Sequence, residues 1–306
     1  MKLDIVGRRY LYFWISLLLI VPGLIGLILW GLPLAIDFTG GGYAELRFES
    51  GEVPPLNEIR ALYAEFEVED AAPRTGGPGE LLVRSGQLTG EGNDLIVAAL
   101  NERYGEVTLL RFDSVGPTIG REVTNRAVWA IAAASLGIMF YIWYAFRGVP
   151  NAHRYGVGAI LAMLHDLAVV FGMQAILSRF FGWEVDALFL TALLTVASFS
   201  VHDSIVVFDR IRENAGKARR RTPYEEIVND SIVQTITRSL NTQITVFLTL
   251  LALVIFGGDT LRHFVIILMI GVLSGTYSSI FNAAPILVVW ENREWETWFR
   301  RKPATR

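Results

Sequence analysis

Long apolar runs make up most of the chain, and a single polar segment interrupts them. A helix needs about 20 mostly apolar residues to cross the hydrocarbon core of a bilayer. Six stretches meet this requirement: residues 11–30, 126–146, 155–177, 187–208, 237–256 and 264–290. The pattern therefore predicts a polytopic α-helical membrane protein with six transmembrane helices and a polar domain between the first and the second.

The composition agrees with this prediction and excludes several classes of function. Hydrophobic residues occupy 52% of the 306 positions and charged residues only 19%, whereas soluble domains carry about 25% charged residues. The absence of cysteine excludes a disulfide scaffold, thiolate catalysis and iron–sulfur ligation. A net charge of −3 provides no basic field for nucleic acid. The four histidines are dispersed without metal-ligand spacing, so we expect no nucleic acid partner, no metal and no cofactor.

The distribution of Lys and Arg predicts the orientation. The first apolar stretch is too long for a signal peptide and lacks a small-residue cleavage site, so we expect it to remain as a helix. With the N-terminus inside, sixteen basic residues fall on the cytoplasmic side and two, Arg179 and Arg262, in the opposite short loops. The positive-inside rule then places both termini in the cytoplasm. The predicted division is an N-terminus and first helix (1–37), an extracytoplasmic domain (38–125), helices two to six (126–292) and a cytoplasmic tail (293–306).

The polar segment has the pattern of a small folded domain. It predicts strands at 43–49, near Val68, at 80–85 and at 106–112, helices at 54–66 and 94–104, and a Gly- and Pro-rich loop at 73–79. The order βαββαβ is that of a ferredoxin-like α+β domain. Fifteen acidic and seven basic residues are scattered over the segment without a catalytic constellation. A binding or lever-like role and a plain spacer both remain open.

Three charged residues fall inside predicted transmembrane helices. Asp166 lies near the middle of the third helix, and Asp203 and Arg238 lie at similar depths in the fourth and fifth. Intramembrane ionisable groups are costly and indicate function by default. Since these last two helices are antiparallel neighbours, we expect an ion pair between Asp203 and Arg238, either as a titrating switch or as a static packing contact.

Hydroxyl groups extend this picture along the same two helices. The fifth helix carries Ser231, Thr235, Arg238, Thr242, Thr245 and Thr249 on one face, and the fourth carries Thr191, Thr195, Ser198 and His202 within an arc of about 60°. Two facing polar faces predict a hydrated seam that could carry protons between carboxylates. Such residues also serve as ordinary interhelical contacts, as does the GxxxG of Gly271 and Gly275.

Five stretches carry a family resemblance that covers nearly the whole chain. They are residues 37–42 (DFTGGG), 115–122 (VGPTIGRE), 164–166 (LHD), 199–214 (FSVHDSIVVFDRIREN) and 237–242 (TRSLNT). They resemble the SecF family of the bacterial SecD/SecF protein translocase, within the resistance-nodulation-division superfamily of proton-driven transporters. The fourth stretch is long and specific, whereas LHD alone is a weak signal.

The resemblance implies both a location and a function. It implies a non-enzymatic subunit of the bacterial cytoplasmic (inner) membrane that pairs with SecD and assists the SecYEG channel. Proton flow would drive a late step of export by moving extracytoplasmic domains against an unfolded preprotein. The family's intramembrane Asp maps to Asp203 and its essential Arg to Arg238, with Asp166 as a further member of the relay. One departure is His202, where the family commonly has Asn; this titratable neighbour could shift the working pH.

Two further features follow from local chemistry. Asp37 and the glycines Gly40, Gly41 and Gly42 come directly after the first helix, where glycine allows positive φ and close backbone approach. They are either a hinge between helix and domain or a simple exit turn. The basic cytoplasmic loop at residues 210–221 could contact anionic membrane lipid.

Two other functions compete with proton-coupled export. Half of a small-molecule or lipid exporter of the same superfamily is the first, although a single domain of about 85 residues leaves little room for a drug-sized pocket. A passive scaffold that recruits another protein is the second. The effect of neutralising the intramembrane charges distinguishes the scaffold from both transport functions.

Overall fold

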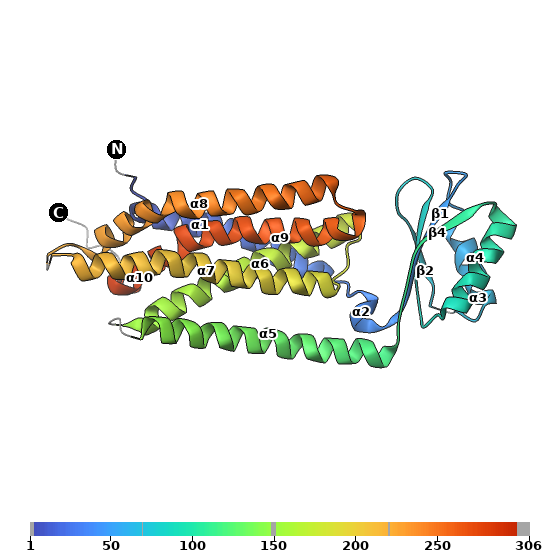
Figure 1. Cartoon of the computed structure of the whole chain (residues 1–306), viewed down its shortest axis with the longest axis horizontal. Helices are drawn as coiled ribbons and strands as arrows, with labels where there is room; N and C mark the ends of the chain where they lie inside the picture. Colours follow the sequence, from blue (N-terminus) through green and yellow to red (C-terminus); the bar gives the residue numbers. More distant parts are fainter. Residues whose placement is uncertain (1–2, 69, 148–150, 220, 299–306) are drawn as a thin grey trace. The chain divides into compact units, whose positions relative to one another are not determined.

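The computed structural model describes residues 3–68, 70–147, 151–219 and 221–298. The chain divides into two compact units, residues 34–130 and residues 1–33 together with 131–306. The first unit contains a four-stranded sheet and the second is a bundle of helices (Figure 1).

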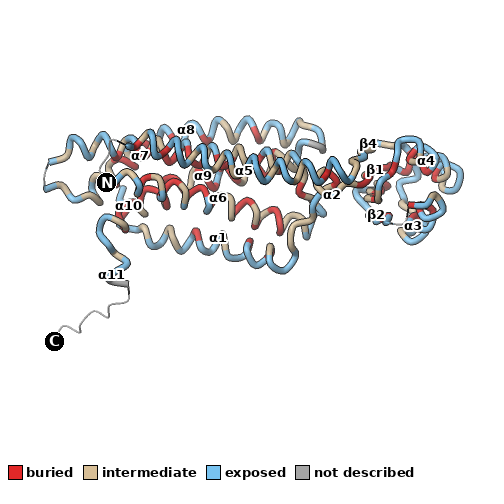
Figure 2. The backbone as a smooth tube through the Cα atoms, turned by 90° about the horizontal axis from the view of Figure 1, so that it is seen from below, coloured by how far each residue is buried: buried red, intermediate tan, exposed pale blue. Residues whose placement is uncertain are grey.

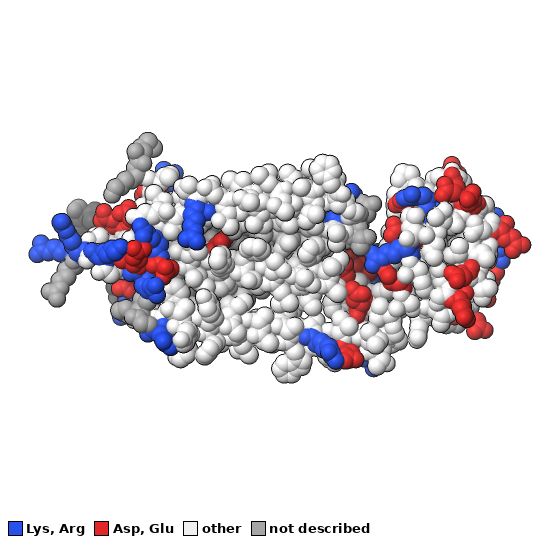
Figure 3. All heavy atoms as spheres, in the orientation of Figure 1, with Lys and Arg blue, Asp and Glu red and all other residues white. Residues whose placement is uncertain are grey.

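The described residues contain six helices long and apolar enough to cross a membrane. These candidate spans are Val6–Trp30, Pro117–Phe146, Ala152–Phe181, Ala187–Lys217, Tyr224–Phe256 and Leu261–Glu291. They confirm the six predicted transmembrane segments. On the face drawn in Figure 3, the middle of the bundle carries few charged side chains, as expected of a surface that contacts lipid.

The helices of the bundle extend beyond the apolar runs. Their bounds are α1 (Arg9–Trp30, after a short 3-10 turn at Val6–Arg8), α5 (Pro117–Phe146), α6 (Ala152–Phe181), α7 (Ala187–Lys217), α8 (Tyr224–Phe256), α9 (Asp259–Ser278), α10 (Ala284–Glu291) and α11 (Trp295–Trp298). The helix α8 begins 13 residues before the predicted Thr237, because its first turns are polar but still helical. Hydropathy detects the apolar core of a helix and not its polar ends.

The last span is a helix interrupted by a wider turn. Residues Ser279–Ala283 form a π-helical turn, η2, between α9 and α10. Pro285 is the second residue of α10 and has no backbone N–H to donate to the preceding turn. The predicted single helix at 264–290 therefore has a local irregularity that an apolar pattern does not reveal.

The interior of the bundle lies mainly among α6, α7 and α9. Figure 2 shows buried residues along these helices and long exposed stretches on α1 and α8. Small residues bring the backbones together: a Cβ added to Gly23 of α1 would lie 2.7 Å from Cα of Gly172 of α6. On α9, a Cβ added to Gly271 would lie 2.0 Å from Cγ2 of Val196 of α7. The GxxxG of α9 thus acts as a packing device.

The α/β unit has the predicted order βαββαβ. Its elements are α2 (Ile36–Thr39), β1 (Gly41–Phe48), α3 (Leu56–Glu65), β2 (Ala72–Thr75), β3 (Glu80–Ser85), α4 (Gly90–Tyr104) and β4 (Val107–Val115). The strands form one antiparallel sheet in the order β2-β3-β1-β4. Leu46, Tyr63, Leu81 and Leu100 are fully buried in the core between this sheet and the two long helices.

One predicted strand of this unit is wrong. Val68 lies in the turn that follows α3, where Glu67 has a φ of 61°, and the second strand forms at Ala72–Thr75 instead. That strand includes Pro73, which has no backbone N–H to donate to a neighbouring strand. Because β2 is the edge strand of the sheet, the missing N–H is tolerated there.

Candidate functional site

Among the described residues of the helical bundle, two carboxyl groups are buried. Asp166 is the fifteenth of the 30 residues of α6, and Asp203 is the seventeenth of the 31 residues of α7. Their exposed fractions are 0% and 4%. Both therefore lie near the middle of helices long enough to span a membrane, which is where charge is most costly.

Asp166 is surrounded by hydrogen-bond donors. Ser274 of α9 donates to Oδ1 at 2.6 Å and Ser278 donates to Oδ2 at 2.7 Å. His165 Nδ1 lies 3.0 Å from Oδ1. A buried carboxylate requires this kind of compensation. Ser274 and Ser278 are four residues apart and therefore lie on one face of α9. This spacing is the sequence signal that could have predicted them as partners of a buried carboxylate.

Asp203 has a different partner from the one predicted. Gln243 Nε2 of α8 donates a hydrogen bond to Asp203 Oδ2, and Gln243 is itself only 4% exposed. Within the described residues, no ion pair joins Asp203 to Arg238, whose side chain is exposed. Arg238 precedes Gln243 by five residues and so lies about 140° away around the helix. The predicted Asp203–Arg238 ion pair is therefore wrong for this chain by itself.

The predicted polar seam is not enclosed between α7 and α8. Ser198 and His202 of α7 and Arg238, Thr242 and Thr245 of α8 are all exposed, and we call these five residues the polar stripe. Thr242 and Thr245 donate to carbonyls one turn earlier in α8, at 3.1 and 2.8 Å.

The two helices do meet through polar groups nearer the start of α8. There Thr235 is buried and donates to the Ser231 carbonyl at 2.9 Å. Asn214 of α7 donates to Ser231 Oγ at 2.8 Å. Ser231 and Thr235 are buried, but the later residues of the predicted polar face, such as Thr242, are exposed. The buried face of α8 instead carries Ser239 and Gln243.

Three buried polar atoms near the carboxyl groups have no hydrogen-bond partner among the described residues. They are His165 Nε2, Ser200 Oγ and Gln243 Oε1. A Cβ added to Gly275 would lie 3.5 Å from Ser200 Cα and 3.6 Å from Asp166 Oδ2, so α6, α7 and α9 meet at this point. Such unpaired groups are rare in protein interiors. Their concentration beside Asp166 and Asp203 marks this region as the functional candidate.

The predicted hinge residues are held in regular structure. Asp37 lies in α2, and Gly41 and Gly42 are residues of the central strand β1. Gly41 has a φ of +120°, and a Cβ on it would lie 2.6 Å from the Ser85 carbonyl oxygen. Gly40 has a φ of +74°. The hinge stays a prediction, and any bend has to fall before Gly41 because bending later would break the ladder with β3 and β4.

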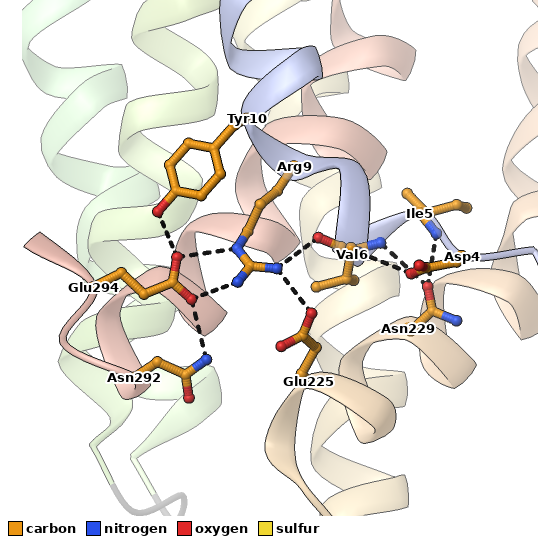
Figure 4. Close-up of polar contacts among 10 residues, drawn as sticks. Asp4, Ile5, Val6, Arg9, Tyr10, Glu225, Asn229, Asn292 and Glu294 are labelled. Carbon is orange, nitrogen blue, oxygen red and sulfur yellow. Dashed lines mark hydrogen bonds and ion pairs between the residues drawn. The ribbon is translucent and has the colours of Figure 1, made fainter. Parts of the chain in front are cut away.

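A second polar cluster lies where α1 and α8 begin and α10 ends (Figure 4). Arg9 donates to both carboxylate oxygens of Glu294, at 3.1 and 2.6 Å, and to Glu225 at 2.8 Å. Asn229 Oδ1 accepts from the backbone N–H of Ile5 at 2.9 Å. These five residues, the Arg9 cluster, connect the segment before α1, the start of α8 and the segment after α10.

Glu294 is the ionisable residue of this cluster that lies outside the candidate membrane spans. Burial opposes its ionisation, but hydrogen bonds from Arg9, Tyr10 and Asn292 outweigh that effect and lower its pKa below the ordinary value. In the sequence, Arg9 is one of the sixteen basic residues that predict the orientation of the chain. Its pairing with residues 216 and 285 positions away has no local pattern that would predict it.

The part of the chain that the structure describes contains no group of three or more His, Cys, Asp or Glu residues that could hold a metal ion. The buried site itself offers carboxyl, hydroxyl, amide and imidazole groups. These groups can hold and pass protons, and the serine and amide donors can stabilise a buried carboxylate.

Known proteins are similar to this chain over nearly its full length. The family described as protein export membrane protein SecD/SecF, C-terminal, matches residues 96–293. The protein translocase subunit SecF of Anaerolinea thermophila is 53% identical over 99% of this chain and 99% of its own length. The corresponding subunit of Thermobaculum terrenum is 48% identical over 98% of this chain and 97% of its own.

The fold is also similar to solved structures. The crystal structure of SecDF, a translocon-associated membrane protein from Thermus thermophilus, matches 96% of this chain with a TM-score of 0.82 and 34% identity. A crystal structure of SecDF in a super-membrane-facing form matches 97% with a TM-score of 0.68. The present chain spans 39% of the first SecDF chain and 40% of the second. With relatives this similar over their whole length, this multi-pass membrane protein belongs to the SecF family of protein translocase subunits.

Proposed function

We propose that this chain couples the proton-motive force to a late step of protein export, together with a SecD subunit. The observation that carries the proposal is the burial of Asp166 and Asp203 near the middle of helices long enough to span a membrane. Buried intramembrane carboxyl groups are the usual proton carriers of pumps and transporters. Burying them costs free energy, and a role in proton transfer accounts for that cost.

Asp203 is the better candidate for the group that gains and loses the proton. It has one side-chain hydrogen-bond donor among the described residues, whereas Asp166 has three potential donors. A change of charge at Asp203 therefore disturbs one contact between α7 and α8. A change at Asp166 would disturb two hydrogen bonds from α9 and the contact with His165, which suits a fixed charge that supports the relay.

The polar stripe is the surface through which a SecD subunit would bind. Polar side chains facing lipid are unfavourable, and Arg238 in particular lies near the middle of α8. A partner subunit that covers the stripe would supply hydrogen bonds to Thr242, Thr245, Ser198 and His202, and a negative group for Arg238. The similarity to SecDF chains more than twice as long agrees with such a partner.

The remaining parts of the proposal concern location and the exported protein. The chain would lie in the bacterial cytoplasmic membrane with both termini in the cytoplasm and the α/β unit outside. That unit would move against an unfolded preprotein emerging from the SecYEG channel. The segment between α1 and α2 would act as the bend, since Gly31 has a φ of +67° and open space around it.

The proposal is tested by halting a preprotein midway through inverted membrane vesicles that contain this chain and SecD. ATP is removed, a proton gradient is imposed, and completed translocation is measured. The wild-type chain should complete translocation, whereas Asp203→Asn should not. Asp209→Asn is the matched control, because Asp209 is an exposed carboxylate on the same helix that pairs with Arg212.

Three outcomes contradict parts of the proposal. Equal translocation by wild type and Asp203→Asn would remove Asp203 from the relay. No effect of the gradient on either would remove the coupling. Full activity of Arg238→Met, with SecD still bound, would show that the polar stripe does not need its charge for the partnership.

A further inference from the structure

Gln243 uses only half of its amide group. Its Nε2 donates to Asp203 Oδ2, and both residues are almost completely buried. Its Oε1 is also buried but has no partner among the described residues. A buried acceptor without a donor is unfavourable. Donation to the buried Asp203 carboxylate accounts for the NH₂ of Gln243, so the Oε1 is the atom that needs another explanation.

An amide can hydrogen-bond to both protonation states of a carboxyl group. A carboxylate only accepts hydrogen bonds, whereas a carboxylic acid also carries an O–H donor. The NH₂ of Gln243 suits the first state and its unused Oε1 suits the second. A half-turn about the terminal Cγ–Cδ bond exchanges the two atoms, and rotation about such a bond is soft.

We propose that Gln243 is a positioning residue that transmits the protonation state of Asp203 to α8: its amide donates to the carboxylate and turns over to accept from the carboxylic acid. This inference rests on the proposed function, because it requires Asp203 to gain and lose a proton. Protonation supplies the donor that Oε1 lacks in the present structure. No covalent bond forms or breaks in Gln243 itself.

The surrounding groups leave this role to Gln243. The other ionisable groups whose charges act on Asp203 are His202 on its own helix and Asp166 on α6. His202 is exposed, and Asp166 is engaged with His165, Ser274 and Ser278. On α8 itself, Arg238 is exposed and makes no ion pair with Asp203 within the described residues.

The position of Gln243 also connects the buried carboxyl group to the polar stripe. Thr242 precedes it directly, and both Thr242 and Thr245 lie on the exposed surface of α8. The contact between Gln243 and α7 is therefore made from the same turn of α8 that carries these hydroxyls. In this way the proton state of a buried group would reach the surface that a partner subunit covers.

The test uses the full chain with SecD in proteoliposomes and compares Gln243→Leu, Gln243→Glu and Ser239→Ala. Ser239 is the matched control, because it lies one turn earlier on the same buried face of α8 and is also 4% exposed. Gradient-driven proton flux is measured against pH. Infrared difference spectra record the C=O stretch of protonated Asp203, which is identified by its loss in Asp203→Asn.

We expect Gln243→Leu to lower proton flux at least tenfold and to move the Asp203 C=O band to higher frequency, as for a carboxylic acid without a hydrogen bond. Gln243→Glu should recover activity only on acidification, because a protonated Glu can both donate and accept. Ser239→Ala should match wild type in both measurements.

The results that overturn the inference are distinct from those that overturn the proposed function. An unchanged Asp203 band and pH profile in Gln243→Leu would refute the role of the amide, even if flux falls, since a purely structural defect would have that effect. Wild-type flux in Asp203→Asn would instead refute the proton carrier, whatever Gln243 does.

Discussion

Replacement of Arg9 by methionine should lower the stability of the bundle at the end where α1 begins. Arg9 pairs with Glu294 through two hydrogen bonds, and the two side chains are only 12% and 14% exposed. Glu225 is 40% exposed and contributes less. Methionine keeps the length of the side chain and its apolar contacts but leaves the Glu294 carboxylate partly buried without its cation.

The expected loss of stability follows from that burial. Removing one partner of a fully buried ion pair costs about 3–5 kcal/mol, because the remaining charge is left uncompensated. Since some solvent reaches this pair, we expect about 2–3 kcal/mol. For a domain of this size the midpoint of thermal unfolding should then fall by about 4–12 °C. A double variant, Arg9→Met with Glu294→Gln, should recover part of the loss because no buried charge remains.

The loss should also depend on pH in a definite direction. The folded-state pKa of Glu294 lies below its ordinary value of 4.5, so its ionised form stabilises the wild-type fold above about pH 4.5. That contribution disappears as the pH falls through the folded-state pKa. Without Arg9, burial favours the neutral acid. The difference in stability between wild type and Arg9→Met is therefore largest at neutral pH and shrinks on acidification.

The assay is thermal unfolding of the purified chain in detergent at several pH values. Arg8→Met is the matched control, because Arg8 is exposed and adjacent in sequence. Equal midpoints for Arg9→Met and Arg8→Met would refute the argument, as would a difference from wild type that grows on acidification.

Two further substitutions test the packing of each unit. Gly271→Ala would place its Cβ 2.0 Å from Cγ2 of Val196, so thermal unfolding in detergent should show that the free energy of unfolding falls by about 1–3 kcal/mol. Gly275→Ala is the control, because its Cβ would meet its neighbours at 3.5 Å and should be tolerated. Equal effects of the two substitutions would contradict the close contact between α7 and α9. In the α/β unit, burial raises the pKa of Tyr63, whose hydroxyl has no partner among the described residues. Tyr63→Phe should therefore stabilise this unit by about 1 kcal/mol, seen as slower hydrogen exchange of the sheet amides, and faster exchange would indicate that the hydroxyl is satisfied.

The sequence predicted those helices and strands in which one hydrophobic pattern extends over the whole element. The six apolar runs were found because each is nearly uniform over about 20 residues, and β3 was predicted with the bounds that the structure has. The strand expected near Val68 failed because a β-branched residue after a helix looks like a strand start. The true strand, Ala72–Thr75, contains a proline that only an edge position permits.

The site was predictable in its charges and not in its partners. Asp166 and Asp203 are conspicuous because charge is rare in apolar runs. The partner of Asp203 was missed because depth along two helices does not fix rotation about them: Arg238 and Gln243 both lie on α8 near the right level, but only Gln243 faces inward. Ser274 and Ser278 were missed because serine is also an ordinary contact residue in membrane helices.

The division of α8 into a buried and an exposed polar face supports the proposal that a partner subunit binds along this helix. An arginine on a lipid-facing surface is costly, and so is a row of hydroxyls, even when threonines satisfy their own O–H groups by donating one turn back. The buried face, with Gln243 beside Asp203, costs less because its groups are mostly paired. The proposed partner would offset the free-energy cost of the exposed face by covering Arg238 with another polar surface. Partner binding and proton handling would therefore share one helix, and a change on either face of α8 should alter the other.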